Sequence, residues 1–405
     1  MKQTDIVICG GGMVGLTLGL AAAQGGLGVA VVDTLSPEKA LDAGFDGRVS
    51  ALAYSSVRML TALGVWPHMA GQAQPITEIL VTDGKPDAPA SPFSLHFDSA
   101  EVGAPSLGHI VENRHIRAAL YAAIPANLSY IAPAGVTALE QAPGHVIVHL
   151  STGEKIRSAL AVAADGRDSK LRGQQGIGVV GWSYPHTGIV ATVAHERPHN
   201  GVAYEHFLPS GPFAILPMTQ NRSSLVWTEA RSKAPAMMAL GEDEFNAEVA
   251  RRFGSHLGAT KVVGGRWSYP LSFHLARDFV RPRFALAGDC AHGIHPIAGQ
   301  GLNLGLKDAA ALVETLLDAA RLGRDIGALD TLKRYERWRR FDSLAMAAST
   351  DALNRLFSND IAPLRHLRDL GLGIVDSIGP ARRFFMRHAG GDIGKLPKLL
   401  KGEAA

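Results

Sequence analysis

An α/β fold is predicted for this chain of 405 residues by three observations. Short apolar runs end in turns rich in glycine and acidic residues at three widely separated places, near residues 5–15, 161–172 and 283–303. The first and third of these turns lead into stretches rich in Leu and Ala, which favour helices. The region 176–275 instead holds runs typical of strands joined by Pro and Gly turns. The length suits two or three domains rather than a single core.

The N-terminal segment from Ile6 to Val32 contains no charged residue, and eight glycines lie within it. A signal peptide or a membrane anchor would not carry so many glycines. A strand–turn–helix–strand unit explains every residue better. The expected elements are a strand over Asp5–Cys9, a helix over Met13–Gln24 that ends at Gly25, and a strand over Val29–Val32.

The turn of this unit has the spacing of a dinucleotide-binding fingerprint, with an acidic residue 18 positions after its last glycine. The first glycine makes the turn, the second lets a pyrophosphate approach, and the third lets the helix pack on the strand. The helix N-terminus offers N–H groups and a partial positive charge to the phosphates. The sequence therefore predicts a Rossmann-like site formed by Gly10, Gly12, Met13, Val14, Gly15 and Asp33.

The fingerprint alone does not choose between NAD and FAD, and two later segments do. In "AVAADGRDSKLR", residues 161–172, an apolar strand leads into Asp165 and Gly166. In "RFALAGDCAHGIHPIAGQGLNLGLKDAAAL", residues 283–312, a strand over Phe284–Ala287 ends at Gly288 and Asp289. A glycine-rich loop then leads into a helix from about Leu302. Taken alone, Asp165-Gly166 and Gly288-Asp289 would each indicate only an ordinary turn.

With the fingerprint, these segments resemble the signature set of the FAD-dependent aromatic hydroxylases, the single-component flavoprotein monooxygenases typified by p-hydroxybenzoate hydroxylase. The segment 46–66 also matches that family, and the resemblance covers roughly residues 4–395. The loop of 287–312 and the segment "GHIVENRHIRAAL", residues 108–120, are similar to the ubiquinone-biosynthesis branch. That branch usually has alanine where this chain has Cys290, whose role the sequence leaves open.

The resemblance implies a role for each motif in holding FAD. Asp165 would stand near the pyrophosphate, Asp289 after Gly288 would bond the ribityl chain, and Arg48 would lie beside the flavin. Backbone N–H groups of the glycine loop would stabilise the negative charge of the reduced flavin. The loop residues expected to face the ring are Pro296, Gly299, Gln300, Gly301, Leu302 and Asn303. His295 would tune the flavin charge or relay a proton, or else fix the loop by a hydrogen bond.

The same resemblance implies a p-hydroxybenzoate hydroxylase-like α/β architecture. In it a Rossmann-like FAD-binding domain is interleaved with a β-sheet substrate domain and followed by C-terminal helices. The expected ranges are 1–70, 105–175 and 276–330 for the first, 71–104 and 176–275 for the second, and 331–405 for the third. Four aromatic residues of the middle region either line the substrate pocket or belong to the core, and the sequence leaves this open. They are Phe207, Phe213, Trp227 and Phe273.

The implied activity is hydroxylation of the aromatic ring of a prenylated phenol in ubiquinone biosynthesis. NAD(P)H would reduce FAD, and O2 would then form a flavin C4a-hydroperoxide that transfers one oxygen atom to the ring. There is no second fingerprint, so NAD(P)H would bind transiently. Hydroxylation of another aromatic substrate, a non-catalytic flavoprotein scaffold and an NAD-dependent dehydrogenase remain alternatives. The ring position, the tail length, the choice of NADH or NADPH and the oligomeric state are left open.

Composition bounds the partners and the compartment. A net charge of +3 is too small to indicate a nucleic-acid partner. Two cysteines form neither a disulfide framework nor a metal site, which favours a reducing, cytoplasmic location. Residues 331–405 carry 14 Lys and Arg against 8 Asp and Glu. This basic segment is compatible with a peripheral contact to the inner membrane or to a biosynthetic complex, and equally with a solvated helical face.

Overall fold

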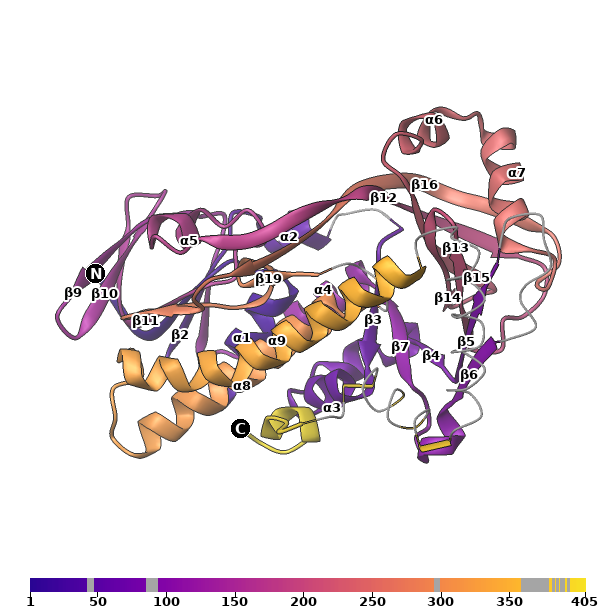
Figure 1. Ribbon diagram of the computed structural model, residues 1–405. Coiled ribbons are helices and arrows are strands. Elements are labelled where there is room, and N and C mark those ends of the chain that lie inside the picture. The colour runs from indigo at the N-terminus through magenta and orange to yellow at the C-terminus, as the bar shows by residue number, and fades with distance from the viewer. Residues whose placement is uncertain are drawn as a thin grey trace.

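The computed structural model describes residues 1–41, 47–84, 94–294 and 299–357, and further 379–380, 383, 386, 390–391 and 394–405. Of residues 347–357 it describes only the backbone. Two large sheets lie at opposite ends of an elongated molecule, and two long strands run from one to the other (Figure 1). The α/β class predicted from the sequence is confirmed.

The first sheet is parallel at its centre. Strand β1 (Lys2–Cys9) pairs in parallel with β11 (Lys155–Ala163) on one side and with β2 (Val29–Val32) on the other. Strands β18 (Phe284–Leu286) and β8 (Leu128–Ile131) continue the parallel order outward. Antiparallel strands complete the sheet, namely β9 (Val136–Ala142), β10 (His145–Leu150) and β17 (Val280–Arg281). Because the central strands are parallel, their carboxyl ends meet at one edge, where open α/β sheets bind ligands.

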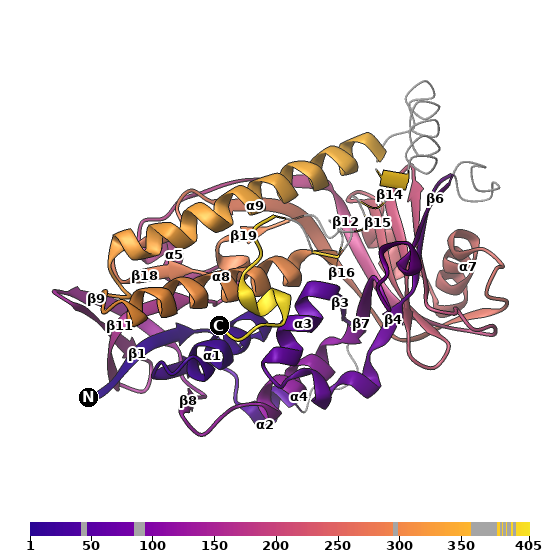
Figure 2. The ribbon, with the colours of Figure 1, turned by 90° about the horizontal axis from the view of Figure 1, so that it is seen from below.

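Helices cover this sheet because its central strands are apolar on both faces, as parallel strands usually are. Helix α1 spans Met13–Gln24, as predicted, and ends at Gly25 and Gly26, the second of which has φ +90°. Figure 2 shows α1, α8 and α9 running side by side on one face. The helices of this part of the molecule are α2 (Pro37–Leu41), α3 (Tyr54–Ala62), α4 (Asn113–Ala122), α5 (Lys170–Gln174), α8 (Gly301–Arg321) and α9 (Leu329–Phe357).

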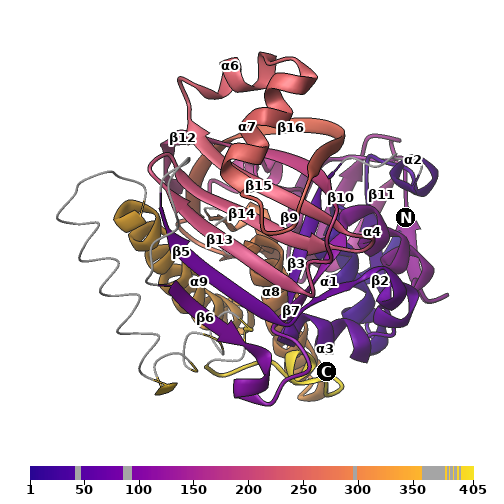
Figure 3. The same ribbon diagram turned by 90° about the vertical axis from the view of Figure 1, so that its right-hand side faces the viewer.

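The second sheet is mostly antiparallel. Its strands follow the order β19-β16-β12-β15-β14-β13-β5-β6. Their bounds are β5 (Glu78–Asp83), β6 (Ser94–Asp98), β12 (Val179–His195), β13 (Val202–Leu208), β14 (Gly211–Met218), β15 (Arg222–Ala230), β16 (Thr260–Ala276) and β19 (His292–Gly293). Helices α6 (Ala234–Ala239) and α7 (Glu242–Phe253) lie on its outer face, away from the first sheet (Figure 3).

A small sheet of three strands joins the two large ones. It consists of β3 (Val49–Ala53), β7 (Gly108–Glu112) and β4 (Gln74–Ile76), all antiparallel. Val49 and Ala51 of β3 and Ile110 of β7 pack against Ala203 and Met218 on the inner face of the second sheet. Through this contact the small sheet positions the second sheet relative to the first. The exact residue ranges of the two domains remain a prediction.

A buried ionic network fastens α9 to the carboxyl end of β18. The Asp308 carboxylate on α8 accepts hydrogen bonds from the Gly288 N–H (2.9 Å), from His292 Nε2 (2.7 Å) and from Arg339 Nε on α9 (2.8 Å). Both Asp308 and Arg339 are almost fully buried. Burial by itself would raise the pKa of Asp308, but His292 and Arg339 hold that pKa below its usual value. The first part of the basic C-terminal segment thus packs on the FAD-binding side of the molecule.

Replacing Arg339 by methionine should destabilise the protein strongly, because it leaves the Asp308 carboxylate buried without its cation. We expect the free energy of unfolding to fall by about 3–5 kcal/mol, measured by thermal or urea unfolding. Arg337→Met on the same helix is the matched control, since Arg337 is exposed, and it should change stability by about 0.5 kcal/mol or less. Equal losses in the two variants would contradict the role of the network.

Candidate active site

Three of the sequence motifs meet where the parallel strands end. Gly10 follows β1 and its N–H donates to the Val32 carbonyl of β2 (2.8 Å). The Ala164 N–H donates to the Cys9 carbonyl (2.8 Å), and the Ala287 N–H donates to the Ala163 carbonyl (3.0 Å). These bonds place the glycine turn, Asp165 and Gly288 side by side along one edge of the sheet. The fold thus brings together residues that lie more than 270 positions apart in the chain.

The three glycines of the fingerprint differ in how much room a side chain would have at each position. Gly10 has φ +114°, and a Cβ added to it would lie 2.3 Å from the Ala164 carbonyl oxygen. A Cβ on Gly15 would lie 1.9 Å from the Gly10 carbonyl oxygen. Gly12 is exposed, and a Cβ on it would meet no protein atom within 4 Å. Gly10 and Gly15 are therefore required by the fold, whereas the space in front of Gly12 is open to a ligand.

Asp33, the predicted ribose partner, also holds the glycine turn in place. Its carboxylate accepts hydrogen bonds from the Gly11 N–H and from the Leu35 N–H (2.7 Å). A carboxylate has about four acceptor positions, so these two bonds leave room for a sugar hydroxyl. The Tyr130 hydroxyl, which is hydrogen-bonded to Tyr121 at 3.0 Å, lies against Gly11 and closes this end of the edge. Sequence reasoning did not single out Tyr130.

Asp165 is linked to the third motif by an interaction between Cys290 and its carboxylate. The Cys290 thiol donates to Asp165 Oδ1 at 3.1 Å, and the Arg172 guanidinium donates to the Cys290 carbonyl at 2.9 Å. Burial and the Asp165 charge raise the pKa of Cys290 well above its ordinary value. A thiol in this state is a weak nucleophile, so Cys290 serves here as a hydrogen-bond donor that orients Asp165.

Two helices begin at this edge, and in the described residues neither has a side-chain cap at its N-terminus. At α1 and at α8 no side chain caps the first turn, and neither first turn holds an acidic residue. By contrast, Ser169 caps α5, and α7 has Glu242, Asp243 and Glu244 in its first turn. The first N–H groups of a helix have no acceptor within the helix, so α1 and α8 both present donors to an anionic ligand. A Cβ on Gly301, like one on Gly12, would meet no protein atom within 4 Å.

Met13 and Val14 lie in the first turn of α1, and their side chains contact protein. Both side chains are half-buried and pack against the core. The Val14 side chain fills the space beside two glycines, because a Cβ on Gly288 would lie 3.2 Å from it and one on Gly305 only 2.5 Å. Val14 thereby joins α1 to α8, and its backbone N–H remains directed along the helix start.

Asp289 stands at the end of β18 with its side chain exposed. Its carbonyl accepts a hydrogen bond from His274 Nε2 at 2.8 Å, which fixes the backbone. No residue in the described ranges donates a hydrogen bond to its carboxylate. An exposed carboxylate at a strand end, held in position by its backbone, is suited to accept bonds from the hydroxyls of a bound ligand.

The glycine loop of the third motif packs against β3. Gly299 has φ +60°, and a Cβ on it would lie 3.0 Å from Ala51. Gln300 precedes α8 and is buried, and Leu302 packs on the core. Pro296, a predicted ring contact, and His295, predicted to tune the flavin charge, relay a proton or fix the loop, lie outside the described residues.

The buried Asn303 side chain binds protein rather than open space. Its Oδ1 accepts from the Ala53 N–H (2.9 Å) and the Ser56 hydroxyl (2.8 Å), and its Nδ2 donates to the Ala51 carbonyl (2.9 Å). Asn303 therefore ties the start of α8 to β3 and α3. Of its polar groups, the backbone N–H in the first turn of α8 is the one placed to meet a ligand.

Arg48 directly precedes β3, between the two large sheets. It is exposed, and its carbonyl accepts from the Asn113 N–H at 3.0 Å. The preceding Gly47 has φ +68°, and a Cβ on it would lie 2.3 Å from the Trp267 ring of β16. Arg48 thus lies next to the contact between Gly47 and Trp267 of the second sheet.

The two faces of the second sheet are buried to very different degrees. On the outer face, under α7, side chains are fully buried, including Phe213 and Trp227, with Arg252 over the Trp227 ring at 4.2 Å. On the inner face, Ala203, Phe207, Ala214 and Met218 are buried, and five side chains keep part of their surface accessible, namely Val190, Glu205, Leu216, Val226 and Trp267. The inner face is the one turned toward β3.

The four aromatic residues considered from the sequence lie in protein cores. Phe213 and Trp227 belong to the core under α7. Phe207 packs with Leu95 near β6, and Phe273 contacts the Trp182 ring at 4.4 Å between centroids. Their positions support the core interpretation rather than the pocket interpretation.

Together these features fit a flavin dinucleotide. The edge offers an open approach at Gly12, two uncapped helix N-termini and an exposed carboxylate at Asp289. In this arrangement α1 meets the pyrophosphate, Asp33 and Asp289 meet hydroxyls, and the start of α8 meets the ring system. These assignments of single residues remain predictions.

Comparison with known proteins decides the family. The model of the FAD binding domain family matches residues 3–346 of this chain. The chain belongs to this family of FAD-dependent hydroxylases. Among its relatives, a ubiquinone hydroxylase, UbiL, of Rhodospirillum rubrum is 50% identical over 99% of this chain and 93% of its own length. A 3-demethoxyubiquinol 3-hydroxylase of Escherichia coli is 35% identical over 96% of this chain and 98% of its own.

Solved structures of this family share the fold. The p-nitrophenol 4-monooxygenase PnpA from Pseudomonas putida superposes with a TM-score of 0.80 over 98% of this chain and 100% of its own, at 18% identity. Membership of the family establishes FAD as the cofactor and the protein as a monooxygenase. It sets aside the NAD-dependent dehydrogenase that the fingerprint alone left open.

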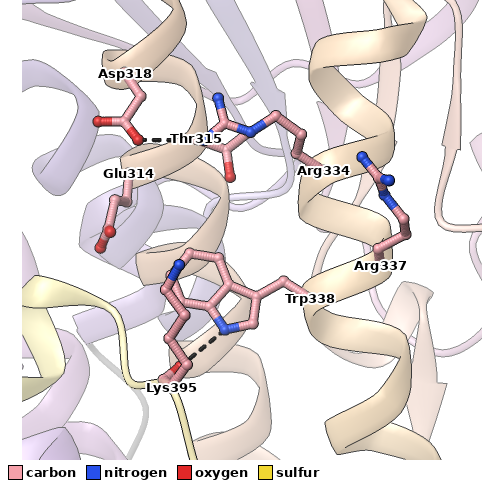
Figure 4. A pocket seen from close by; sticks show the side chains of 7 residues that line it. All are labelled: Glu314, Thr315, Asp318, Arg334, Arg337, Trp338 and Lys395. Carbon is pink, nitrogen blue, oxygen red and sulfur yellow. Dashed lines mark hydrogen bonds and ion pairs between the residues drawn. The ribbon is translucent and has the colours of Figure 1, made fainter.

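A separate pocket of ≈ 360 Å³ lies on the far side of α8, away from the strand ends (Figure 4). Its charged groups are largely engaged: Arg334 pairs with Asp318 at 3.5 Å, and the Trp338 indole N–H donates to the Lys395 carbonyl at 2.8 Å. The contact of Trp338 with Lys395 holds this C-terminal stretch beside α8 and α9. In the described part of the chain no group of three or more potential ligands could hold a metal ion.

Gly12→Val should abolish FAD binding while leaving the fold intact. A Cβ at this position meets no protein atom, so the apoprotein should keep its thermal unfolding midpoint, but the side chain would occupy the approach of the pyrophosphate. Flavin absorbance of the purified protein and its circular dichroism measure the two effects. Gly15→Val is the contrasting variant, because its side chain would collide with Gly10, and it should unfold. Normal flavin content in Gly12→Val would refute the assignment.

Asp289→Ala should weaken FAD binding by roughly 10- to 150-fold, because hydrogen bonds to a charged group contribute about 1.5–3 kcal/mol. Equilibrium titration of the apoprotein with FAD measures this affinity. Asp330→Ala, an exposed carboxylate in the first turn of α9, is the control and should bind FAD normally. Equal affinities of the Asp289 variant and the wild type would remove Asp289 from the site.

Proposed function

We propose that this protein hydroxylates the aromatic ring of a prenylated phenol in ubiquinone biosynthesis, with FAD as its bound cofactor and NAD(P)H and O2 as co-substrates. The observation that carries the proposal is the edge of the first sheet, where two uncapped helix N-termini and Asp289 face an open approach. The relatives named for ubiquinone hydroxylation match this chain along nearly its whole length, which supports the substrate class.

The protein's part in this reaction is to hold and orient the cofactor and the substrate and to exclude water from the site. FAD, when bound, takes a hydride from NAD(P)H and activates O2 for transfer of one oxygen atom to the ring. The start of α8 provides N–H groups where negative charge gathers on the flavin. The Cys290 thiol and the Asp308 network hold Asp165 and Gly288 at the strand ends, so that the site is formed before a ligand arrives.

The space below the second sheet suits an apolar substrate. Its inner face presents Val190, Leu216, Val226 and Trp267, all partly accessible. A phenol with a prenyl tail would bury its carbon atoms against these side chains, at about 25 cal/mol per Å² of apolar surface removed from water. Another aromatic substrate of similar polarity is the closest alternative, because the described residues do not fix the length of the tail.

A peripheral contact with the inner membrane through the basic C-terminal segment is part of the same proposal. No helix in the described ranges is long and apolar enough to span a bilayer. On α9, Phe341 is 76% exposed and lies next to Arg337 and Arg340, and Leu344 is also exposed. Apolar side chains flanked by arginines favour the surface of an anionic membrane. Such a contact would bring the site to a substrate with a prenyl tail.

The test is an absorption spectrum of the purified protein followed by NADPH oxidation under air, with and without a 2-polyprenylphenol. We expect a yellow protein whose NADPH oxidation rises several-fold with the phenol, and a product one oxygen atom heavier by mass spectrometry. Oxidation that responds only to other aromatic compounds would favour the alternative substrate. A yellow protein that oxidises no NAD(P)H with any phenol would favour a non-catalytic scaffold.

A further inference from the structure

Glu205 is an acidic side chain on the inner face of the second sheet. In β13 side chains alternate between the two faces. Ala203 packs with Ile110 on the inner face, and Phe207 packs with Leu95 on that same face. Glu205 lies between them in the alternation and therefore points inward, toward β3, while Tyr204 packs with the core under α7. Figure 3 shows that α6 and α7 cover only the opposite face.

The neighbours of Glu205 on this face are apolar. In the sheet register it stands beside Ala214 of β14 and Val81 of β5. The same row continues through Val226 of β15 and Val190 of β12 to Trp267 of β16. Among the residues that the structure describes, none donates a hydrogen bond to the Glu205 carboxylate or pairs with it. A carboxylate without a partner in an apolar row is costly to the folded protein unless a ligand meets it.

The ionisation of Glu205 reflects this environment. Burial raises the pKa of Glu205 to about 8. The residue nevertheless keeps partial access to solvent. A carboxyl group whose pKa is raised toward neutral by its surroundings, and which a ligand can still reach, is typical of a group that handles protons.

Charged groups on the elements around Glu205 are few and mostly engaged. On β5, Asp83 lies two residues beyond Val81 on the same face and is buried. Arg222 at the far end of β15 bonds to Glu112 of β7 at 3.0 Å. Arg48 directly precedes β3, and on α9 the Asp342 carboxylate accepts from Arg339 at 2.7 Å. Burial is the cause of the raised pKa of Glu205, with no contribution from a neighbouring charge in the described residues.

Glu205 faces the same space as the flavin loop. Ala203, two residues before Glu205, belongs to the cluster that contains Ala51 of β3. Ala51 in turn lies against Gly299 of the flavin loop, 3.0 Å from an added Cβ. At the other end of the row, Trp267 lies against Gly47, next to Arg48. β3 thus connects the row of Glu205 to the flavin loop at the start of α8.

We propose that Glu205 is a catalytic residue of the substrate site: its carboxylate accepts a hydrogen bond from the ring hydroxyl of the phenol and takes the hydroxyl proton. This inference rests on the proposed function. The phenol O–H bond breaks, a new O–H bond forms on Glu205, and the electron pair stays on the phenol oxygen. No electrons are transferred to the protein. The proton returns to the product oxygen or to water before the next substrate binds.

This chemistry uses the environment described above. An ordinary carboxylate has a pKa far below that of a phenol, near 10, and takes its proton poorly. Burial brings the two groups closer in proton affinity, which makes transfer between them easier. The negative charge left on the phenol oxygen spreads into the ring and makes its carbons better nucleophiles. The apolar row keeps water from competing for the carboxylate.

Binding of 4-methylphenol to the flavin-loaded protein tests the proposal without turnover. Ionised Glu205 accepts the phenol hydrogen bond more strongly than the neutral acid does, so wild-type affinity should rise by up to about tenfold between pH 7 and pH 9, as expected for a group with a pKa near 8. Isothermal titration calorimetry in the absence of NAD(P)H measures it. In Glu205→Gln the amide does not titrate, and affinity should be lower and independent of pH. Glu205→Asp keeps a carboxylate and should keep a pH dependence.

Glu78→Gln is the matched control. Glu78 lies on β5 in the same sheet, but on the opposite face, where it pairs with His96 at 2.8 Å. This variant should bind 4-methylphenol as the wild type does, with the same dependence on pH. The rate of hydroxylation should follow the same pattern, falling in Glu205→Gln and rising less with pH.

Stability provides a readout that needs no phenol. The folded-state pKa of Glu205 lies above its unfolded value, so the folded protein loses stability as pH rises toward and through about 8. Replacing Glu205 by glutamine removes that loss. The unfolding midpoint of Glu205→Gln relative to wild type should therefore be higher at pH 9 than at pH 6, and in Glu78→Gln the difference should not change in this way.

The outcomes separate this inference from the proposed function. Wild-type protein that hydroxylates a prenylated phenol, while Glu205→Gln binds 4-methylphenol with an unchanged affinity and pH dependence, would overturn the role of Glu205 and keep the function. Wild-type protein that neither binds nor hydroxylates any phenol would overturn both. Loss of the pH dependence in Glu205→Gln, with normal flavin content and its retention in Glu78→Gln, would establish Glu205 as the proton acceptor.

Discussion

The Asp308 carboxylate is the interaction on which the rest of the site depends. It joins the backbone of Gly288, the ring of His292 and the guanidinium of Arg339, all within a buried region where an unpaired charge would be costly. Through it α8 holds the end of β18, and α9 holds α8. The strand ends are held in place from behind by this network, while the glycine turn and Asp289 stay exposed on the ligand side.

The second sheet divides its two faces between stability and function. The outer face is sealed by α7, and Phe213 and Trp227 are fully buried there. Among the described residues, the inner face contacts the small sheet of β3, β4 and β7, and α9 also reaches β14. Because aromatic side chains bury large apolar areas, they gather where packing is closest, which is the outer core. The inner face carries mostly apolar side chains, among them Val190, Val226 and Trp267, together with the carboxylate of Glu205.

The fold and the cofactor edge could be predicted from the sequence because both depend on local patterns. The glycines that end α1 and the fingerprint spacing before it determine the helix bounds, and the observed bounds agree with them. Contacts between distant segments leave no such pattern. Nothing near Asp165 indicates that Cys290, 125 positions away, donates to it, and nothing near Asn303 indicates that its side chain serves β3 rather than a ligand. Glu205 looks in the sequence like any polar residue of an alternating strand, since its environment exists only once β3 lies below it.

A carboxylate that acts as a base in apolar surroundings must be desolvated without being paired with a cation. The position of Glu205 meets both requirements. Deep burial with a cation nearby would lower its pKa and make it a poor proton acceptor, whereas free exposure would give it the pKa of an ordinary carboxyl group. In the described residues its neighbours in the row are Val81 and Ala214, which desolvate it without pairing with it. The same apolar surface that burial of a prenyl tail requires therefore also prepares the carboxylate for the phenol at the head of that tail.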